Sequence, residues 1–564
     1  YGTLLADLSI RQDLRALTKG LAAEASVSFD NIGGMNETTN KEYRYMNSNA
    51  SITSDGTLVT TPAIYGTDSE TLGHTQPFER LMLRSDFQAK VDYNRTFGKH
   101  QVGGALIYDM QSVVKNGRNN SQKNQSVLVN ATYTYDNRYS LNAVFNRSGS
   151  AYLPDGDKYS NYPAVSAAWI ISNEAFMEKV TPINLFKIRA SYGLSGWDGN
   201  LSHELWRQSY GSGGAGYNFG VNAGGQSGGS EGDLPVIGLV AEKSQKATFG
   251  FDLAAFDNRL NATVEGFYEK RSDILVSGAN STSGIIGITV GQVNEGIYKY
   301  KGVDASLSWN DKIGDFHYGI GASMSYLNTE VVNVNQAYQE YDYLYTKGNR
   351  IGQMYGLEAI GFFNSQQEIN NSPQQTFSDV APGDVKYKDQ NGDNRIDEKD
   401  IVKMFGSSVP RFYFGFNLNF SYKRLELSAD FQGMTGVTVS LLNSPLYSPL
   451  VSNGNISNTF LNEEISWTPE NKTNATMPRL TTQENLNNYR ASSLWYRDGS
   501  FLKLRNLLVA YTFPKSQTRF ADLKVFVQGT NLFSLDNIHF ADPEQLGIAY
   551  PSTRSYWAGI KLNF

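Results

Sequence analysis

Cysteine is absent from this sequence of 564 residues. A disulfide framework is therefore excluded as the source of its stability. The 5 histidines stand singly along the chain, so no pair has the spacing of a zinc site. Lysine and arginine, 49 together, are outnumbered by 55 acidic residues, which gives a net charge of -6. A nucleic-acid-binding protein would favour a basic surface, so we expect no nucleic-acid partner.

Long hydrophobic runs are also absent. No stretch of about 18 apolar residues exists, so no transmembrane helix is expected, and the mean hydropathy is only -0.41. A barrel that crosses a membrane with strands escapes both tests, because only every second residue of a strand is apolar. The chain begins at Tyr1 without a charged and then apolar leader, so we expect that a signal peptide is not part of this sequence.

Alternation with a period of two residues is the dominant pattern. Every even position from 412 to 422 is apolar or aromatic, and most of the odd positions between them are small or polar. The pattern resumes over 425–432 after the pair Lys423-Arg424. In a strand, the two sets of side chains face opposite ways. A single hairpin of this kind also suits a water-soluble sandwich.

Repetition of the pattern narrows the choice. The alternating segments 129–135 and 139–145 flank the turn Asp136-Asn137-Arg138, and the same three residues recur at 257–259. Further hairpins are expected near 3–31, 79–115, 161–195, 296–330 and 499–535. Many of these strands have about 10 residues or more, which is the length that a tilted membrane strand needs.

Connections of two kinds alternate along the chain. Short turns are predicted at 15–19, 98–100, 136–138, 257–259, 311–315 and 423–424. Long polar stretches are predicted at 32–78, 196–241, 276–295, 331–410 and 438–498. An outer-membrane barrel has short periplasmic turns and long surface loops, whereas a soluble sandwich has no reason to sort its connections in this way. The predicted fold class is therefore an all-β transmembrane antiparallel barrel with long extracellular loops.

The sorting of the connections also predicts the parity of the strands. The first short turn would be periplasmic, so the first strand begins outside, and the last strand ends at Phe564 in the periplasm. The count is then odd, roughly 17 or 19, whereas single-chain bacterial barrels have even counts. We therefore expect this chain to be incomplete and cut at a surface loop.

Several segments resemble one family of outer-membrane proteins. They are Pro163–Trp169, Phe256–Leu260, Gly383–Asp389, Asp498–Asn506, Gly529–Phe533 and the closing strand Tyr550–Phe564 with its terminal aromatic residue. Together they are spread over almost the whole chain. On these segments the chain resembles the SusC-like TonB-dependent outer-membrane transporters, and the most specific match is Gly383–Asp389 with the acidic run that follows it.

The resemblance implies a barrel of about 22 strands around a plugged lumen. Residues 1–564 would be its C-terminal portion, with an Asp-rich loop at 383–400. An N-terminal plug domain, a TonB-interacting segment and the first strands are not recognisable here. The implied function is nutrient import, most simply of an oligosaccharide or else a peptide, without chemistry on the substrate, so we expect no catalytic residue. The implied partners are a SusD-like surface lipoprotein, the TonB complex, the plug as a missing or separate segment, and the surrounding lipid and lipopolysaccharide.

The acidic loop is a candidate metal site. Side-chain oxygens fall at positions 1, 3, 5, 9 and 12 of one loop, and position 7 could add a backbone carbonyl. These positions are held by Asp389, Asn391, Asp393, Asp397, Asp400 and, at position 7, Arg395. The spacing predicts a structural Ca²⁺ site. Two departures are Gly392 at position 4 instead of 6 and an aspartate at position 12, and the alternative is an Asx-rich turn without an ion.

Aromatic residues of the long loops and strand ends are candidate substrate contacts, because aromatic faces stack on the apolar faces of sugar rings. The candidates are Trp197, Trp206, Tyr210, Tyr217, Tyr341 and Tyr343, with Tyr338 and Tyr345 beside them. The competing interpretation is an aromatic girdle at the membrane interface.

Three other functions remain open on the sequence. A siderophore or vitamin receptor with the same mechanism would show a pocket rich in arginine and aromatic residues. A barrel that does not transport could serve as a surface scaffold, and a plug found on this or a companion chain would argue against it. A soluble all-β glycan-binding enzyme would stay monodisperse without detergent, which a membrane barrel would not.

Overall fold

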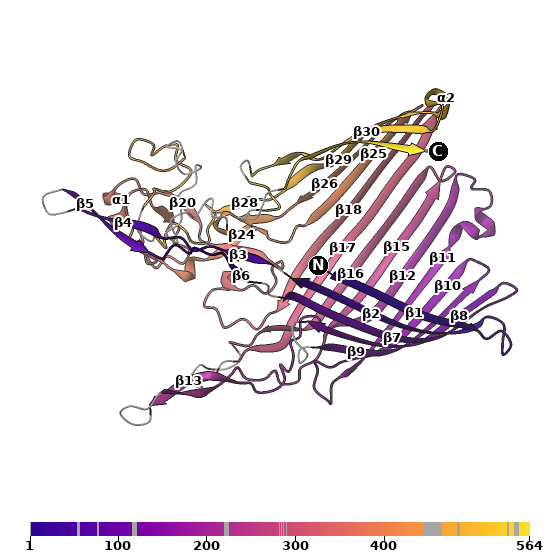
Figure 1. Ribbon diagram of the computed structural model, residues 1–564, viewed down its shortest axis with the longest axis horizontal. Helices are drawn as coiled ribbons and strands as arrows, with labels where there is room; N and C mark the ends of the chain where they lie inside the picture. Colours follow the sequence, from indigo (N-terminus) through magenta and orange to yellow (C-terminus); the bar gives the residue numbers. More distant parts are fainter. Residues whose placement is uncertain are drawn as a thin grey trace. The chain divides into compact units, whose positions relative to one another are not determined.

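The computed structural model shows a protein whose regular secondary structure is almost entirely β-strand, joined by long connections (Figure 1). The described residues are 2–35, 37–52, 57–75, 78–115, 121–218, 225–280, 283, 285, 287–288, 290–443, 465–481, 485–538, 541–545 and 552–564. No helix in this part of the chain is long and apolar enough to cross a membrane.

One antiparallel sheet contains seventeen of the strands in the described ranges. Seventeen is one of the two counts that the parity of the connections predicts. The chain divides into two compact units. The first comprises Tyr1–Thr132, Val144–Tyr162 and Asp198–Leu205, and the second comprises Tyr133–Ala143, Pro163–Trp197 and Trp206–Phe564.

The first unit holds the early strands, in which each strand pairs with the next one along the chain. They are β1 (Gly2–Asp13), β2 (Leu21–Met35), β7 (Phe78–Phe97), β8 (His100–Lys115), most of β9 (Gln122–Tyr135) and the later half of β10 (Tyr139–Ser150). The pairings β1–β2, β2–β7 and β7–β8 are antiparallel along nearly their whole length.

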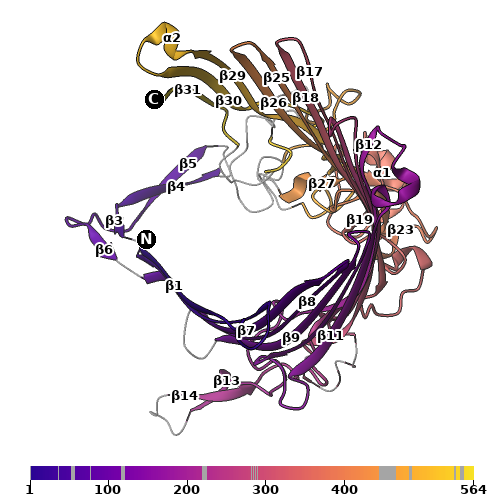
Figure 2. The same cartoon turned by 90° about the vertical axis from the view of Figure 1, so that its right-hand side faces the viewer.

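The second unit holds the later strands, again paired in chain order where the intervening loops are skipped. They are most of β11 (Tyr159–Ile170), then β12 (Ile183–Trp197), β15 (Glu242–Ala255), β16 (Leu260–Ser277), β17 (Gln292–Ile313), β18 (Phe316–Asn333), β25 (Phe412–Tyr422), β26 (Leu425–Thr435), β29 (Phe501–Phe513), β30 (Asp522–Asp536) and β31 (Ser555–Asn563). Figure 2 shows β25, β26, β29 and β30 side by side.

The predicted short turns are confirmed. The connections 98–99, 136–138, 256–259, 314–315 and 423–424 each join two neighbouring strands of the sheet. Two connections on the same side are longer than expected, because they contain short helices. These are η2 (Ile171–Asn173) and η3 (Ala175–Met177) after β11, and α2 (Lys515–Thr518) after β29.

The two Asp-Asn-Arg turns have different backbones. In the first, Asp136 and Asn137 have φ of 51° and 53°, and Arg138 N–H donates to the carbonyl of Tyr135 at 2.9 Å. These are the features of a type I′ turn, whose twist matches that of the flanking strands. In the second, Phe256 also has a positive φ of 56°, which makes three consecutive left-handed residues. The same three-residue sequence therefore does not ensure the same turn geometry.

The alternation of the sequence separates two faces of the sheet. On β9 and β10, the apolar face carries Val129, Tyr133, Leu141 and Phe145, which are 40–48% exposed. The opposite face is polar, and it places the hydroxyls of Thr134 and Ser140 3.1 Å apart. A sheet with large exposed apolar side chains along one whole face needs an apolar surrounding.

The long connections differ from the expected polar loops because they contain ordered structure of their own. Extra hairpins are β4 (Tyr45–Ile52) with β5 (Leu58–Tyr65) and β13 (Tyr210–Asn218) with β14 (Gly225–Glu231). The two longest connections even have hydrophobic cores. One core contains Leu357, Val385, Tyr387 and Ile396, and the other contains Leu441, Met477 and Trp495. These buried residues lie outside the strand periodicity on which the sequence analysis depended.

Candidate functional site

The loop body consists of segment 334–411 and, in the second long connection, the described residues 436–443, 465–481 and 485–500. The two parts hydrogen-bond extensively to one another. The first segment forms β19 (Gln353–Gly356), β20 (Ala359–Phe362), α1 (Gln366–Asn370), β21 (Gln374–Gln375), β22 (Val385–Tyr387), β23 (Arg395–Ile396), η6 (Glu398–Asp400) and β24 (Val402–Ser407). The second forms β27 (Thr438–Ser440) and β28 (Tyr496–Asp498), which pair with each other.

Asp384 links the two segments of the loop body. Its carboxylate is fully buried and accepts from Arg479 Nε at 2.7 Å and Nη2 at 3.2 Å. Asn485 and Asn488 each donate a side-chain N–H to Oδ1, at 3.1 and 2.9 Å, and Ala381 N–H donates to Oδ2 at 2.7 Å. A buried charge is tolerated only when it is paired and hydrogen-bonded. Asp384 meets both conditions, so it holds the two segments together at a specific place.

Side-chain amides extend this link. Asn488 Oδ1 accepts from Val385 N–H at 2.8 Å, and Gln375 Nε2 donates to Asn487 Oδ1 at 2.7 Å. The hydroxyl of Tyr387 donates to the carbonyl of Asn487 at 2.7 Å, and burial raises the pKa of that hydroxyl. A network in which the members satisfy one another makes the loop body rigid. None of these amides or Arg479 was singled out by the sequence analysis, because no periodicity marks them.

The acidic loop follows Asp384 closely, and its side chains cap its own backbone. Asp389 accepts from the N–H of Gly392 at 2.6 Å and of Asn394 at 2.9 Å. Asp400 is fully buried and accepts from Gln390 N–H at 2.7 Å and Asp397 N–H at 2.8 Å.

Two further carboxylates of the acidic loop, those of Asp393 and Asp397, behave in the same way. Asp393 accepts from Arg395 N–H, and Asp397 caps η6 by accepting from Lys399 N–H, each at 2.8 Å. Asn391 also turns back on the loop, since its Oδ1 accepts from Asp393 N–H at 3.1 Å. Within the described ranges, no group of three or more His, Cys, Asp or Glu side chains is arranged to hold a metal ion. The Asx turns of the alternative interpretation are present, and the calcium site stays a prediction.

Tyr341 and Tyr343 are the two aromatic candidates that the structure brings together. Their rings stack with centroids 5.3 Å apart and planes 14° from parallel. The Tyr343 hydroxyl donates to the carbonyl of Lys399 at 2.7 Å, and Lys399 Nζ lies 2.8 Å from a carboxylate oxygen of Glu340. The aromatic pair is therefore fixed to the end of the acidic loop, which gives it a defined orientation.

The remaining aromatic candidates lie apart from this pair. Trp197 ends β12 and is 54% exposed, and Tyr210 begins β13 and is 76% exposed. Trp206 lies under the guanidinium of Arg207, which is 4.4 Å from the ring centroid. Tyr217 lies in β13, and its side chain is outside the described part of the structure. No ring contact among described side chains joins any of these to Tyr341 or Tyr343.

The polar face of the sheet in the second unit carries a charged cluster. Asp252 on β15 lies 3.2 Å from Lys187 Nζ and 3.4 Å from Arg189 Nε, both on β12. Arg189 also pairs with Glu265 on β16, and Thr263 Oγ1 donates to Asp252 at 3.1 Å. Charges of both signs face one another on this side of the strands, so the face is suited to water and polar solutes rather than to lipid.

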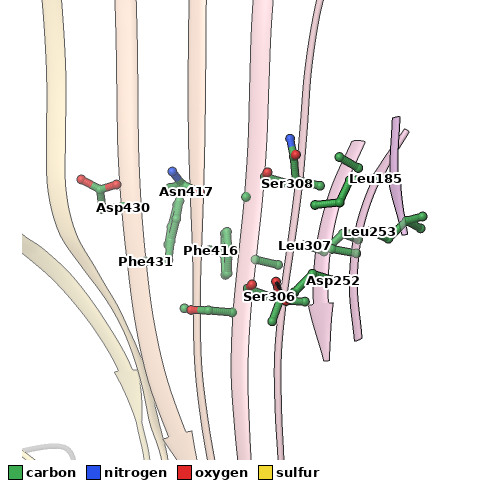
Figure 3. A pocket seen from close by; sticks show the side chains of 18 residues that line it. Leu185, Asp252, Leu253, Ser306, Leu307, Ser308, Phe416, Asn417, Asp430 and Phe431 are labelled. Carbon is green, nitrogen blue, oxygen red and sulfur yellow. Dashed lines mark hydrogen bonds between the residues drawn. The ribbon is translucent and has the colours of Figure 1, made fainter. Parts of the chain in front are cut away.

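A hollow of about 590 Å³ lies beside this cluster (Figure 3). One row of small residues runs across this hollow. It starts beside Asp252 on β15, and its members, paired in register on the next four strands, are Thr263, Ser306, Ser323 and Gly415. The next row ends at the pair Asn417 and Asp430, on the opposite side of the hollow from Asp252 in the close view.

Glycine at position 321 belongs to this row for a steric reason. A Cβ there would lie 2.0 Å from Oδ1 of Asn417, so only glycine lets that amide lie across the strand. The hollow is thus lined by hydroxyl, amide and carboxylate groups together with larger apolar side chains, among them Leu307, Phe416 and Phe431.

These features define a class of protein. Tall antiparallel strands, one apolar and one polar face of the sheet, short turns at one end and long folded loops at the other are the features of an outer-membrane β-barrel. The antiparallel barrel fold was predicted from the sequence and is confirmed.

Comparison with known proteins identifies the relatives of this chain. No family model matches it. It is 28% identical to the TonB-dependent receptor P26 of Formosa agariphila, over 77% of this chain and 45% of that protein. It is 26% identical to the TonB-dependent receptor P3 of the same organism, over 84% and 51%. With the TonB-dependent receptor SusC of Bacteroides thetaiotaomicron it shares 22%, over 77% and 43%.

A solved structure agrees with these relatives. The structure of the RagAB peptide transporter matches with a TM-score of 0.73 and 19% identity, over 100% of this chain and 62% of that one. The chain spans about half the length of the curated relatives that it matches. The resemblance to SusC-like TonB-dependent outer-membrane transporters is thereby confirmed, and the outer membrane is the location of this barrel.

Proposed function

We propose that the whole protein imports a nutrient across the outer membrane in a TonB-dependent way. The observation that carries this proposal is the polar hollow on the inner face, bounded by Asp252 and Asp430, in a barrel that is similar to TonB-dependent receptors. Such a face offers hydrogen bonds to a polar solute from its hydroxyl, amide and carboxylate groups. A plug domain would gate the lumen, and the TonB complex would supply the energy, as the family resemblance implies. The relatives are named as receptors, and we propose no reaction on the substrate.

The substrate that we propose is an oligosaccharide. The stacked pair Tyr341 and Tyr343 presents an aromatic surface of defined orientation on the loop body. Such a surface suits the C–H face of a sugar ring, and the neighbouring amides and carboxylates suit its hydroxyls. A peptide is the second candidate, because the structural neighbour with a TM-score of 0.73 is described as a peptide transporter.

We also propose that a SusD-like surface lipoprotein binds over the long loops. Three apolar side chains of this region are unusually exposed: Tyr338 at 86%, Phe405 at 72% and Ile360 at 52%. Exposed apolar groups on an otherwise polar loop body suit a protein partner. Co-purification of a lipoprotein with the tagged protein from native membranes, lost in the double variant Ile360→Asp/Phe405→Asp, is the expected result.

Binding to the purified full-length protein in detergent tests the substrate. A panel of oligosaccharides and a panel of peptides are titrated calorimetrically against the wild type and against Tyr341→Ala/Tyr343→Ala. We expect oligosaccharide binding that is weakened about tenfold or more in the double variant, since each stacked ring contributes about 1–3 kcal/mol in comparable planar contacts. Tyr422→Ala, at a periplasmic turn, is the matched control. Binding of peptides alone would replace the first candidate by the second, and binding of neither panel would contradict both.

We propose further that the acidic loop binds a structural Ca²⁺, with Asp389, Asp393 and Asp397 as side-chain ligands. Support comes from the sequence, in which every second residue from Asp389 to Asp397 offers an oxygen. At Arg395 that oxygen would be the backbone carbonyl. Calcium should slow proteolysis of the loop body in the wild type and have no effect on Asp389→Asn/Asp393→Asn. Asp379→Asn, an exposed aspartate outside the loop, is the control. If calcium protected all three proteins equally from proteolysis, or protected none of them, the proposed calcium site would be contradicted. The carboxylates would then serve only to form the Asx turns.

A further inference from the structure

A second hollow, of about 610 Å³, lies in the first unit and has no part in the proposed import path. Its lining contains apolar side chains from the early strands and polar ones from the adjacent strand ends. The residues that matter here are Val27, Phe87, Met110, Lys123, Gln125, Lys158 and Tyr159.

The hollow opens on the apolar face of the sheet. Val27, Phe87 and Met110 are in register on β2, β7 and β8, and Val27 and Met110 are 51% and 46% exposed. The next pair along the same two strands, Ser28 and Asp86, faces the opposite, polar side of the sheet. There the Asp86 carboxylate accepts from the hydroxyl of Ser28 at 3.1 Å. In an outer-membrane barrel the apolar face contacts lipid. The hollow therefore faces the membrane and not the lumen.

The hollow lies toward the extracellular end of the strands. Lys123 is the second residue of β9, and the short turns 98–99 and 136–138 lie at the opposite ends of β8 and β9. Tyr159 begins β11 after the connection from β10, also on the long-loop side. At this height the surrounding lipid is the outer leaflet.

A single tyrosine shapes the hollow. The ring of Tyr159 lies across β10 at Gly149, where a Cβ would be 2.5 Å from a ring carbon. Only glycine leaves room for the ring. The Tyr159 hydroxyl thereby reaches Gln125 on β9, and the hydroxyl of Tyr108 donates to Gln125 Oε1 at 3.4 Å. Hydrogen bonds across β8, β9 and β11 thus hold this wall in place.

The rim of the hollow is basic. Lys123 is exposed. The guanidinium of Arg147 lies 5.5 Å from the centroid of the Tyr159 ring and donates to Asn161 Oδ1 at 3.3 Å. Lys158 Nζ contacts Asp155 Oδ1 at 2.5 Å, but that aspartate is 86% exposed, and so exposed a pair is easily exchanged for another anion. Lys123 and Lys158 thus line the hollow, and Arg147 lies beside its Tyr159 wall, at the level of the outer-leaflet headgroups.

We propose that this hollow binds a phosphorylated, multiply acylated glycolipid of the outer leaflet. One acyl chain would lie in the trough formed by Val27, Phe87 and Met110, and a phosphate would lie among Lys123, Arg147 and Lys158. The charge complementarity favours a phosphorylated headgroup, and the trough favours an acyl chain over a water-soluble phosphate. The proposal depends on the outer-membrane location and not on the nature of the imported substrate.

Native mass spectrometry of the delipidated full-length protein tests the proposal, with bisphosphorylated lipid A as the probe. The charge variant is Lys123→Gln/Arg147→Gln/Lys158→Gln. Its matched control, Lys19→Gln/Lys99→Gln/Lys423→Gln, removes the same charge at the opposite ends of the strands. We expect one tightly bound lipid A on the wild type and on the control, and binding about tenfold weaker or more in the charge variant, because charge-assisted hydrogen bonds are lost. Gly149→Val, which displaces the Tyr159 ring, should weaken binding while all three cations remain.

Further probes separate the proposed lipid from other occupants. Dephosphorylated lipid A should bind the wild type as weakly as lipid A binds the charge variant. Equal binding of phosphatidylglycerol and lipid A would overturn the proposal in favour of any anionic lipid. Equal lipid A binding by wild type and charge variant, in proteins whose heat-modifiable folded band is the same, would also overturn it. So would a protein dimer that excludes the lipid and dissociates in Gly149→Val.

Discussion

At the scale of single residues, Asp384 is the most constrained side chain of the loop body. It is fully buried, and its two oxygens accept five hydrogen bonds, two of them from Arg479. Removing one partner of a buried ion pair costs about 3–5 kcal/mol, because the other charge is left without compensation. The sheet has its own ladder of hydrogen bonds, so this loss should be confined to the loop body.

We predict that Asp384→Ala opens the loop body but leaves the barrel folded. Hydrogen exchange should accelerate at Val385 and Tyr387 and stay slow in β16 and β17. Asp379→Ala, which alters an exposed aspartate of the same segment, should change neither. Loss of protection in the sheet as well would show that loops and barrel unfold as one unit.

Buried tyrosines make the loop body sensitive to alkali. Burial raises the pKa of Tyr489 from 10.0 to about 12, and burial also raises that of Tyr387. An unfolded chain ionises its tyrosines near the ordinary pKa, so the stabilisation is fully present below pH 10 and is lost as the pH rises toward 12.

We predict that the loop body melts between about pH 10 and 12. Tyrosinate absorbance and hydrogen exchange of the loop segments should change together over this interval. Tyr489→Phe should lessen the pH dependence, because one of the shifted groups is gone. A pH profile that is the same in wild type and variant would contradict a role for Tyr489.

At the scale of elements, the short turns were the most predictable parts and the long loops the least. Asp136 and Asn137 adopt positive φ, which asparagine and aspartate tolerate better than most residues. The apolar core residues of the loop body, such as Trp495 and Leu357, come from short segments in which no long alternation or helical period is present. They are contributed by segments far apart in the sequence, so local pattern cannot reveal them.

We predict that Asn137→Val slows assembly of the β9–β10 hairpin and that Asn137→Gly does not. A β-branched residue in the left-handed region costs about 1–2 kcal/mol, whereas glycine enters it freely. The yield of the heat-modifiable folded form after dilution from urea measures the effect. An equal yield for both variants would mean that the sheet, and not the turn, sets the register here.

At the scale of the whole molecule, the two faces of the sheet decide where the protein can exist. Leu307 is 52% exposed on the apolar face of β17, and its neighbour Ser306 lies in the polar row of the hollow. An arginine placed on the lipid face of a barrel costs about 2–4 kcal/mol near the middle of the bilayer and little in the lumen.

We predict that Leu307→Arg lowers the free energy of unfolding in lipid vesicles by about 2–4 kcal/mol, and that Ser306→Arg lowers it by less than about 1 kcal/mol. Denaturant titration in vesicles gives both values. The reverse ranking would exchange the lipid and lumen faces, and with them the assignment of the two hollows.

The sequence by itself determined the membrane-barrel class, the positions of most short turns and long connections, and the family resemblance. Those properties depend on local patterns: the alternation of a strand and the residues that a tight turn accepts. Only the tertiary structure decided that Asp384 meets Arg479, which lies 95 positions further along the chain, and that Tyr159 crosses Gly149 to reach Gln125. Hydrogen bonding and steric fit between distant segments have no local period, so the polar link in the loop body and the hollow on the membrane face exist only in the folded chain.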